Sequence, residues 1–283
     1  MRPYAFGLLL FSAALLGALP YIAAPPAASQ PVLPSAPYSQ SQSVSATLYN
    51  VFLFIALVAA ATIAVYFAIR FKRIFRAFIA AAWFMIVWGV SWAYAIKYYS
   101  CGLLPDWAAA ALVYAPLALG PAVVLAVFRR RGDVAIAFLS ALAGTMLVWM
   151  LPPPTVLALM VALPIYDLFM VYKGLLGRLI KKARGEVGRP DAPRGEPPLF
   201  GLMARVGDLS VGTGDFFAYS MALTAIGVKY SALGPLAAIG FMALGLALIY
   251  VGFKLTAELL LKRRGYAPAL PIPMALVLPL ILL

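Results

Sequence analysis

The sequence predicts an all-α membrane protein with about nine transmembrane helices. Of its 283 residues, 65% are hydrophobic and only 11% are charged, whereas soluble domains have about 25% charged residues. The apolar residues come in blocks of roughly 20, the length that crosses about 30 Å of hydrocarbon as a helix. Because lipid offers no hydrogen-bond partners to backbone groups, we expect these blocks to be helical.

The apolar blocks define the predicted spans, which in chain order are 4–24, 47–69, 77–96, 107–128, 134–151, 155–176, 208–228, 232–256 and 266–283. The first block follows a lone Arg2 and resembles a signal peptide, but it is long for one, which favours a retained span. Pro25–Ser45 is rich in Pro, Ser and Ala and has no charge, so we expect it to be an exterior loop.

A charged joint rich in Pro and Gly, residues 181–198, divides the chain. It separates an N-terminal part, residues 1–180 with six predicted spans, from a C-terminal part, residues 199–283 with three. We interpret the joint as a cytoplasmic loop.

The basic residues predict the orientation in the membrane. The formal charge of +13 lies at the ends of the apolar blocks, so lipid head groups, and not nucleic acid, are the expected partners. If nine spans alternate, nearly all of these residues fall on one side: Arg2, Arg70, Lys72, Arg73, Arg76, Arg129–Arg131, residues 178–194 and Lys262–Arg264. We therefore expect a multi-pass protein of the cell membrane with a cytoplasmic N-terminus and an exterior C-terminus.

The composition also limits the chemistry. Cys101 is the only cysteine and histidine is absent, which excludes disulfides, Cys/His metal sites and nucleophiles paired with His. Acid-base chemistry must then use carboxylates, Lys or Tyr, and we expect no metal and no cofactor.

Two carboxylates stand out, because an ionised carboxylate at mid-bilayer is costly. Asp167 lies in the middle of the sixth predicted span and Asp215 in the seventh. These consecutive spans run antiparallel, so the two side chains can meet at one depth, nearer the cytoplasm. Two carboxylates in one low-dielectric site hold a single proton near neutrality. In that state one member activates a water and the other polarises a peptide carbonyl.

Gly212 and Gly214 precede Asp215 and remove side chains from that part of the span. The gap lets a substrate backbone approach or lets the helix loosen. A Gly-x-Gly by itself more often indicates a plain contact between helices.

Pro271 and Pro273 open the last predicted span. They cannot donate to the carbonyls of Ala267 and Ala269, which predicts irregular backbone lining a cavity. A helix that simply starts with Pro in its first turn explains the same spacing equally well.

Three sequence motifs together resemble the presenilin and signal peptide peptidase family of intramembrane aspartyl proteases. They are Tyr166-Asp167, Gly212-Thr213-Gly214-Asp215 and Pro268-Ala269-Leu270, which match its YD, GxGD and PAL motifs in order and on the sixth, seventh and ninth spans. The resemblance implies a presenilin-like fold in which Asp167 and Asp215 are catalytic. It further implies that substrate contacts come from Tyr166, Gly212, Thr213, Gly214, Pro268, Ala269 and Leu270.

The resemblance also implies partners. Presenilin-like members share the expected orientation and act on transmembrane helices of type I membrane proteins, whose N-termini lie outside. The joint 181–198 lacks the long apolar insertion at which presenilins cut themselves. Self-cleavage and obligatory partner subunits are therefore not expected, as in compact archaeal members, and a homo-oligomer is left open.

The paired carboxylates alone indicate a proton- or cation-coupled transporter, or a leak channel, as readily as a protease. A transporter would more often show two related halves, and no internal repeat is visible. A purely structural membrane protein fits less well, because Asp167 and Asp215 have no obvious Lys or Arg partner in the sequence.

Overall fold

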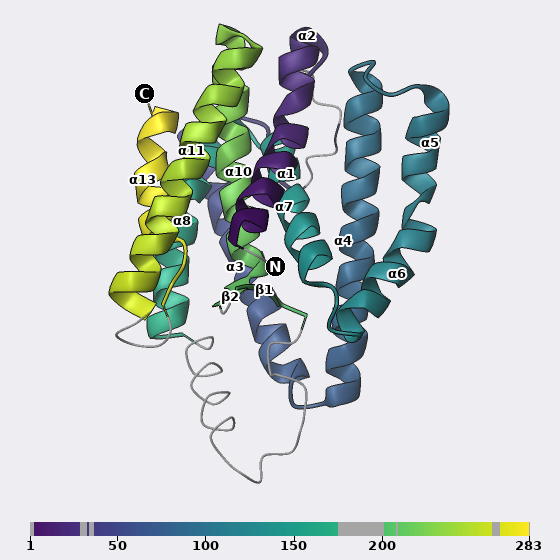
Figure 1. Ribbon diagram of the computed structural model, residues 1–283, viewed down its shortest axis with the longest axis vertical. Helices are drawn as coiled ribbons and strands as arrows, with labels where there is room; N and C mark the ends of the chain where they lie inside the picture. Colours follow the sequence, from purple (N-terminus) through teal and green to yellow (C-terminus); the bar gives the residue numbers. More distant parts are fainter. Residues whose placement is uncertain are drawn as a thin grey trace.

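The computed structural model describes residues 3–28, 33, 37–174, 201–207, 209–261 and 267–282. The predicted loop 181–198, and with it the proposed division of the chain, lies outside these residues. Within them the protein is a bundle of helices that run roughly along one axis, with one small hairpin of strands near the lower end of the bundle in Figure 1.

The elements follow one another in this order: α1 Pro3–Ala23, α2 Pro25–Ala28, α3 Val44–Ala68, α4 Lys72–Ser100, α5 Asp106–Tyr114, α6 Pro116–Phe128, α7 Asp133–Met150, α8 Pro153–Tyr172, β1 Met203–Val206, β2 Leu209–Gly212, α10 Thr213–Tyr230, α11 Pro235–Thr256 and α13 Pro271–Leu282. A 3-10 turn, Ser231–Leu233, precedes α11, and a π-helical turn, Ala257–Leu261, follows it.

Seven of the described helices are long and apolar enough to cross a membrane, namely α1, α3, α4, α7, α8, α10 and α11. The predicted span 107–128 is broken into α5 and α6, which meet at an angle of 41° just before Pro116. The predicted span 266–283 contains only the 12-residue α13. The chain is thus an all-α membrane protein with several spans, but the prediction of nine full spans is not confirmed.

The core of the bundle is formed by α1, α7 and α10, which contact one another extensively. Close approach depends on glycines at two positions. A Cβ on Gly144 of α7 would collide with the backbone of Phe217 in α10, and one on Gly17 of α1 would lie 2.6 Å from Thr145. Small residues of this kind let membrane helices approach closely. The helix that carries Asp215 is therefore held between two neighbours.

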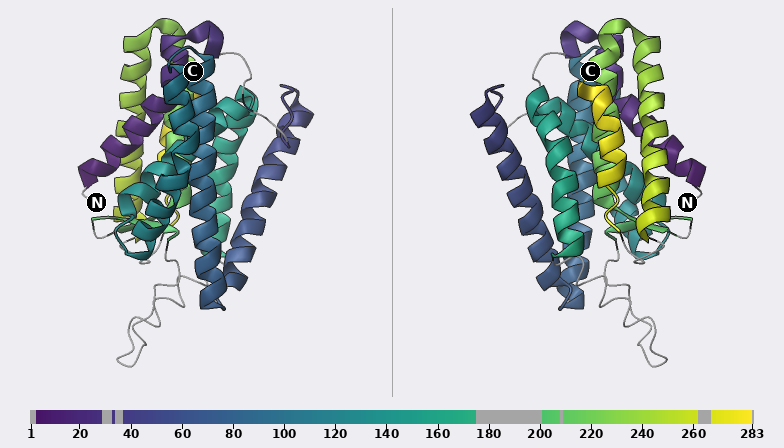
Figure 2. Two further views of the ribbon diagram at one scale, coloured as in Figure 1. Left: turned by 90° about the vertical axis from the view of Figure 1, so that its right-hand side faces the viewer. Right: turned by 90° about the vertical axis from the view of Figure 1, so that its left-hand side faces the viewer.

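The remaining helices surround this core. In the side views of Figure 2, α3 lies at the edge of the bundle opposite α1, and it packs against α8 and α4. On the other side α11 and α13 pack against each other and against α10. α8 and α13 also contact each other, so that α8, α10 and α13 adjoin one another.

Two buried polar side chains fix the upper end of the bundle. The Asn50 amide of α3 exchanges hydrogen bonds with the backbone of Ser39 and also donates to Thr155 of α8. Lys97 is 2% exposed, and its ammonium donates to the carbonyl of Ala28 at 2.6 Å. This buried cation lies in the last turn of α4.

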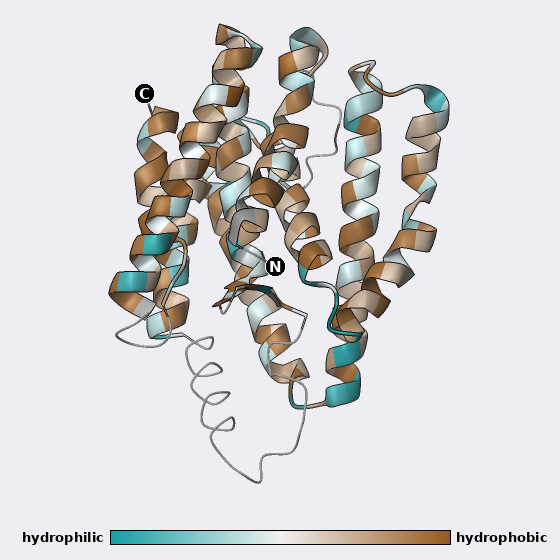
Figure 3. Ribbon diagram, in the orientation of Figure 1, coloured by the Kyte–Doolittle hydropathy of each residue, from teal (hydrophilic) through white to brown (hydrophobic). Residues whose placement is uncertain are grey.

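Hydrophilic residues gather at the lower ends of α4 and α11 in Figure 3. The connection between α3 and α4, with Arg70, and the connection between α6 and α7, with Arg129–Arg131, lie at this same end of the molecule (Figure 1). The predicted segregation of basic residues to one side thus has a counterpart in the arrangement of the described helices.

Candidate active site

Asp215 lies in the first turn of α10. Gly212 is the N-cap residue of this helix, and its N–H donates to the Asp215 carboxylate at 3.0 Å. A carboxylate at this position pairs with a backbone donor that the helix itself leaves free. The prediction that a helix spans 208–228 is therefore wrong at its start, because Leu209–Gly212 form a strand and the helix begins at Thr213.

The strands β1 and β2 form an antiparallel hairpin that ends at the GxGD residues. Gly212 pairs with Met203, and the Thr213 N–H donates to the carbonyl of Leu202 at 3.1 Å. The hairpin is anchored in turn, since the Trp83 indole of α4 donates to the carbonyl of Gly201 at 2.9 Å. Hydrogen bonds thus hold the segment that leads into Asp215, and this segment also packs against α7.

Asp167 lies in the last part of α8, five residues before its end at Tyr172. Pro164 stands inside the helix one turn earlier and lacks the N–H that would continue the hydrogen-bond ladder. The Asp167 carboxylate is partly buried and accepts the N–H of Leu270 at 3.2 Å. The N–H of Ala269 also interacts with it.

The PAL residues form a non-helical segment immediately before α13. The Leu270 carbonyl accepts the N–H of Met274 at 3.0 Å, which starts the helix. The Ala269 carbonyl accepts the hydroxyl of Tyr219 at 2.6 Å. Pro273 cannot donate to this carbonyl, and a side chain from α10 takes the place of the missing backbone donor. A Cβ on Gly252 of α11 would lie 2.5 Å from Pro273, so the first turn of α13 is packed tightly against α11.

The structure brings the two predicted carboxylates into one site. Asp167 and Asp215 interact electrostatically with each other, and both interact with the Tyr219 hydroxyl. The site is built from α8, α10 and the PAL segment. Neither Asp167 nor Asp215 forms an ion pair with a Lys or Arg within the described residues.

The two glycines of the GxGD motif do not serve helix packing. A Cβ on Gly214 would have no atom of the described chain within 4 Å, and one on Gly212 would meet only the Asp215 carboxylate, at 3.2 Å. Gly214 is exposed. The interpretation of Gly-x-Gly as a helix contact is therefore wrong here, and the backbone beside Asp215 is open to another chain.

The other predicted contact residues lie around the same site. Pro268 is buried and Thr213 is partly buried. Tyr166 precedes Asp167, and its hydroxyl is buried without a hydrogen-bond partner in the described part of the chain. An unpaired buried hydroxyl is a donor that a bound group could use.

Tyr219 is the functional candidate whose contact the sequence did not predict. It stands four residues after Asp215, one helical turn away on the same face. This spacing indicates from the sequence that Tyr219 lies near the carboxylate of Asp215. Its bond to Ala269 depends on a segment 50 residues further along the chain, which no local pattern specifies.

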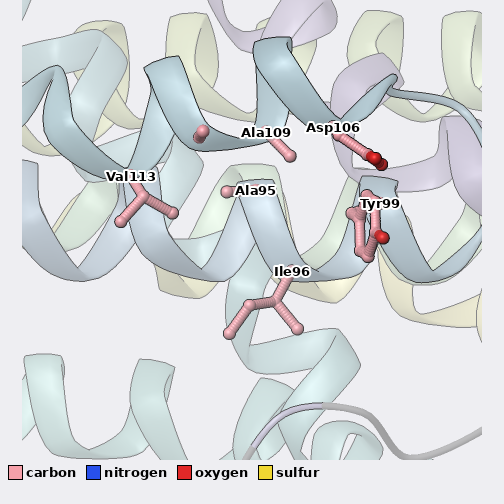
Figure 4. A pocket seen from close by; sticks show the side chains of 7 residues that line it. Ala95, Ile96, Tyr99, Asp106, Ala109 and Val113 are labelled. Atoms are coloured by element: carbon pink, nitrogen blue, oxygen red, sulfur yellow. The ribbon is translucent and has the colours of Figure 1, made fainter.

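The described cavities lie elsewhere. A pocket of about 270 Å³ opens between α4 and α5 near their upper ends, lined mainly by Ala95, Ile96, Ala109 and Val113 with Tyr99 and Asp106 at one end (Figure 4). A second lies by Arg76 and Phe128 at the lower end. The part of the chain that the structure describes contains no group of three or more His, Cys, Asp or Glu side chains arranged to hold a metal.

Comparison of the sequence with known protein families and with curated proteins finds no match.

Proposed function

We propose that this protein is an intramembrane aspartyl endopeptidase, which hydrolyses peptide bonds within the transmembrane segments of other membrane proteins. The observation that carries the proposal is the pairing of Asp167 and Asp215 from two apolar helices in a site that has no cationic partner among the described residues. Membrane helices rarely tolerate such residues unless they serve a function.

The chemistry follows from the shared proton. The ionised carboxylate takes a proton from a water, whose oxygen attacks the carbonyl carbon of the scissile peptide while the protonated carboxyl donates to the carbonyl oxygen. The tetrahedral intermediate then collapses: one of its hydroxyls returns a proton to the carboxylate that had donated one, the C–N bond breaks, and the amine nitrogen takes the proton that the other carboxyl received from the water. The carboxylates of Asp167 and Asp215 can fill both roles without a metal or another cofactor.

Substrate seating is proposed at the open backbone of Gly214. A transmembrane helix must unwind before its backbone can reach two carboxylates, and an extended peptide can then pair with exposed backbone groups. The strand β2, which leads directly into Gly212, offers such groups beside the site. We propose that Tyr166, with its unpaired hydroxyl, and the PAL segment, which contacts Asp167, supply further substrate contacts.

The presenilin type is the proposed subclass. It is supported by the convergence of Tyr166-Asp167, the GxGD residues and the PAL residues in one site. We further propose a cell-membrane location with a cytoplasmic N-terminus and type I substrates, because basic residues of the described connections gather at one end of the bundle. No obligatory partner subunit is proposed, because residues 181–198 lack a long apolar insertion.

The test is cleavage of a single-span type I reporter by the purified protein, comparing wild type with Asp167→Ala and Asp215→Ala. Asp106→Ala is the matched control, because it removes a carboxylate far from the site at the start of α5. We expect the wild type and Asp106→Ala to cut within the span, and the other two variants to be folded and inactive. If reporter cleavage is absent, or survives either substitution, while proteoliposomes conduct protons or cations, the transporter or channel alternative replaces the proposal.

A further inference from the structure

A single peptide group connects the two helices that carry the carboxylates. The carbonyl of Ala269 accepts the hydroxyl of Tyr219 from α10 at 2.6 Å. The N–H of Leu270, which belongs to the same peptide bond, donates to Asp167 of α8 at 3.2 Å. In a trans peptide these two groups point in opposite directions. The peptide group is therefore bound by α10 at its carbonyl and by α8 at its N–H.

The sequence around this peptide leaves it few alternatives. Pro268 and Pro271 carry no N–H, so Ala269 and Leu270 are the only backbone donors between them. Both donors interact with Asp167. A rotation of the Ala269–Leu270 peptide would remove the Leu270 donor from Asp167, and no amide of the flanking prolines could replace it.

Tyr219 is well placed to prevent that rotation. Its side chain is fully buried, and its ring lies 6.4 Å from that of Phe6 in an edge-on arrangement. It is also one helical turn beyond Asp215. A buried, packed ring keeps one rotamer, so its hydroxyl is a fixed donor. A hydrogen bond to the carbonyl also polarises the peptide and strengthens the N–H on its other side.

We propose that Tyr219 is a positioning residue: through the Ala269 carbonyl it orients the Leu270 N–H toward Asp167 and thereby sets the geometry of the catalytic pair. The proposal rests on the proposed protease function. Tyr219 acts through the PAL segment and does not itself touch the substrate. Its removal should therefore change the rate of the chemical step and leave substrate affinity as it is.

The test compares two substitutions that each remove one hydroxyl from α10. Tyr219→Phe breaks the bond to Ala269. Tyr230→Phe, the matched control, breaks a bond of the same kind to the carbonyl of Leu280 at 3.0 Å, which joins the other end of α10 to the end of α13. A role in stability alone would make the two variants alike.

We expect Tyr219→Phe to lower kcat for reporter cleavage about tenfold, the size of effect expected when one buried hydrogen bond no longer orients a catalytic group. KM should stay within about twofold, and Tyr230→Phe should keep the wild-type kcat while its unfolding temperature falls as much as that of Tyr219→Phe. Equal kcat values for the two variants, or a Tyr219→Phe effect confined to KM, would overturn the proposal.

Hydrogen exchange at the Leu270 amide provides a readout that does not need activity. In Tyr219→Phe this amide should exchange at least about tenfold faster than in the wild type, whereas in Tyr230→Phe its rate should be unchanged. Unaltered exchange in Tyr219→Phe would refute the positioning role even if the protein is an active protease. Conversely, if Tyr219→Phe accelerates exchange at Leu270 but the wild-type protein never cleaves the reporter, the positioning role stands and the proposed function is refuted.

Discussion

The closest packing of the bundle predicts a test of how the core supports the site. In Gly144→Ala, the new Cβ on α7 would collide with the Phe217 carbonyl oxygen, and would lie 2.5 Å from the Ser220 hydroxyl oxygen and 2.8 Å from the Phe217 carbonyl carbon. Ordinary contacts begin at 3.4 Å, so α10 must move away from α7 by at least about half an ångström. Phe217 stands two residues after Asp215, which must move with it.

The magnitude follows from that displacement. Forcing an extra methyl group into a well-packed core costs about 1–3 kcal/mol, and a misplacement of about 1 Å in a catalytic site lowers rates by on the order of 100-fold. We therefore expect Gly144→Ala to unfold at lower temperature in detergent and to cleave the reporter at least about tenfold more slowly than the wild type.

Substitution of a second glycine serves as the control, because it separates the effect of close packing from the effect of replacing Gly by Ala within a helix. Among the described residues, no atom lies within 4 Å of the position of a Cβ added to Gly240 of α11, so Gly240→Ala changes mainly the residue's backbone freedom. This variant should be at least as stable as the wild type, because Ala is favoured over Gly inside a helix. If Gly144→Ala matches Gly240→Ala in both unfolding temperature and cleavage rate, the inference that α7 fixes the position of Asp215 is refuted.

Three further predictions follow from other parts of the structure. Gly214→Ala should fold like the wild type, because the added Cβ meets no atom of the described residues within 4 Å. Its reporter cleavage should nevertheless fall at least about tenfold because the methyl group occupies the proposed substrate path; unchanged cleavage would place the substrate elsewhere. Asn50→Ala should lower the free energy of unfolding by about 1–3 kcal/mol in thermal or denaturant unfolding, since it removes a hydrogen-bond partner from the partly buried backbone of Ser39 and from the buried hydroxyl of Thr155; equal stability would contradict this interpretation. Cleavage measured across pH should fall at both extremes, because acid protonates the ionised member of the pair and alkali removes the shared proton; a flat profile would argue against a shared proton.

The sequence was most informative where long apolar blocks or charged residues within them carry the signal. Hydropathy alone places α1, α3, α4, α7, α8, α10 and α11, because a span is defined by length and composition. The meeting of Asp167 and Asp215 was predictable because consecutive spans run antiparallel and pack as neighbours. The positions of the spans follow from the composition of each apolar block, and the meeting of the two carboxylates follows from the order of neighbouring blocks along the chain.

The details that the sequence did not predict depend on distant partners. Leu209–Gly212 continue an apolar block and read as the start of a helix, yet they pair with Met203–Val206 as a strand; the Gly207-Asp208 pair between the two strands is the turn signal that could have revealed it. The bond from Tyr219 to Ala269 joins residues 50 positions apart. Such contacts are set by the tertiary packing of α10 and α13, which local patterns do not specify.

The central claim is that Asp167 and Asp215 together hydrolyse a peptide bond within the membrane, and isosteric substitution tests it most directly. Asp167→Asn and Asp215→Asn retain the size of each side chain and an oxygen to accept the N–H groups of Leu270 and Gly212, while removing the acid-base function. Mass spectrometry of a single-span substrate incubated with each folded variant should find products cut within the span only for the wild type. Cleavage at the same bond by either variant would contradict the claim.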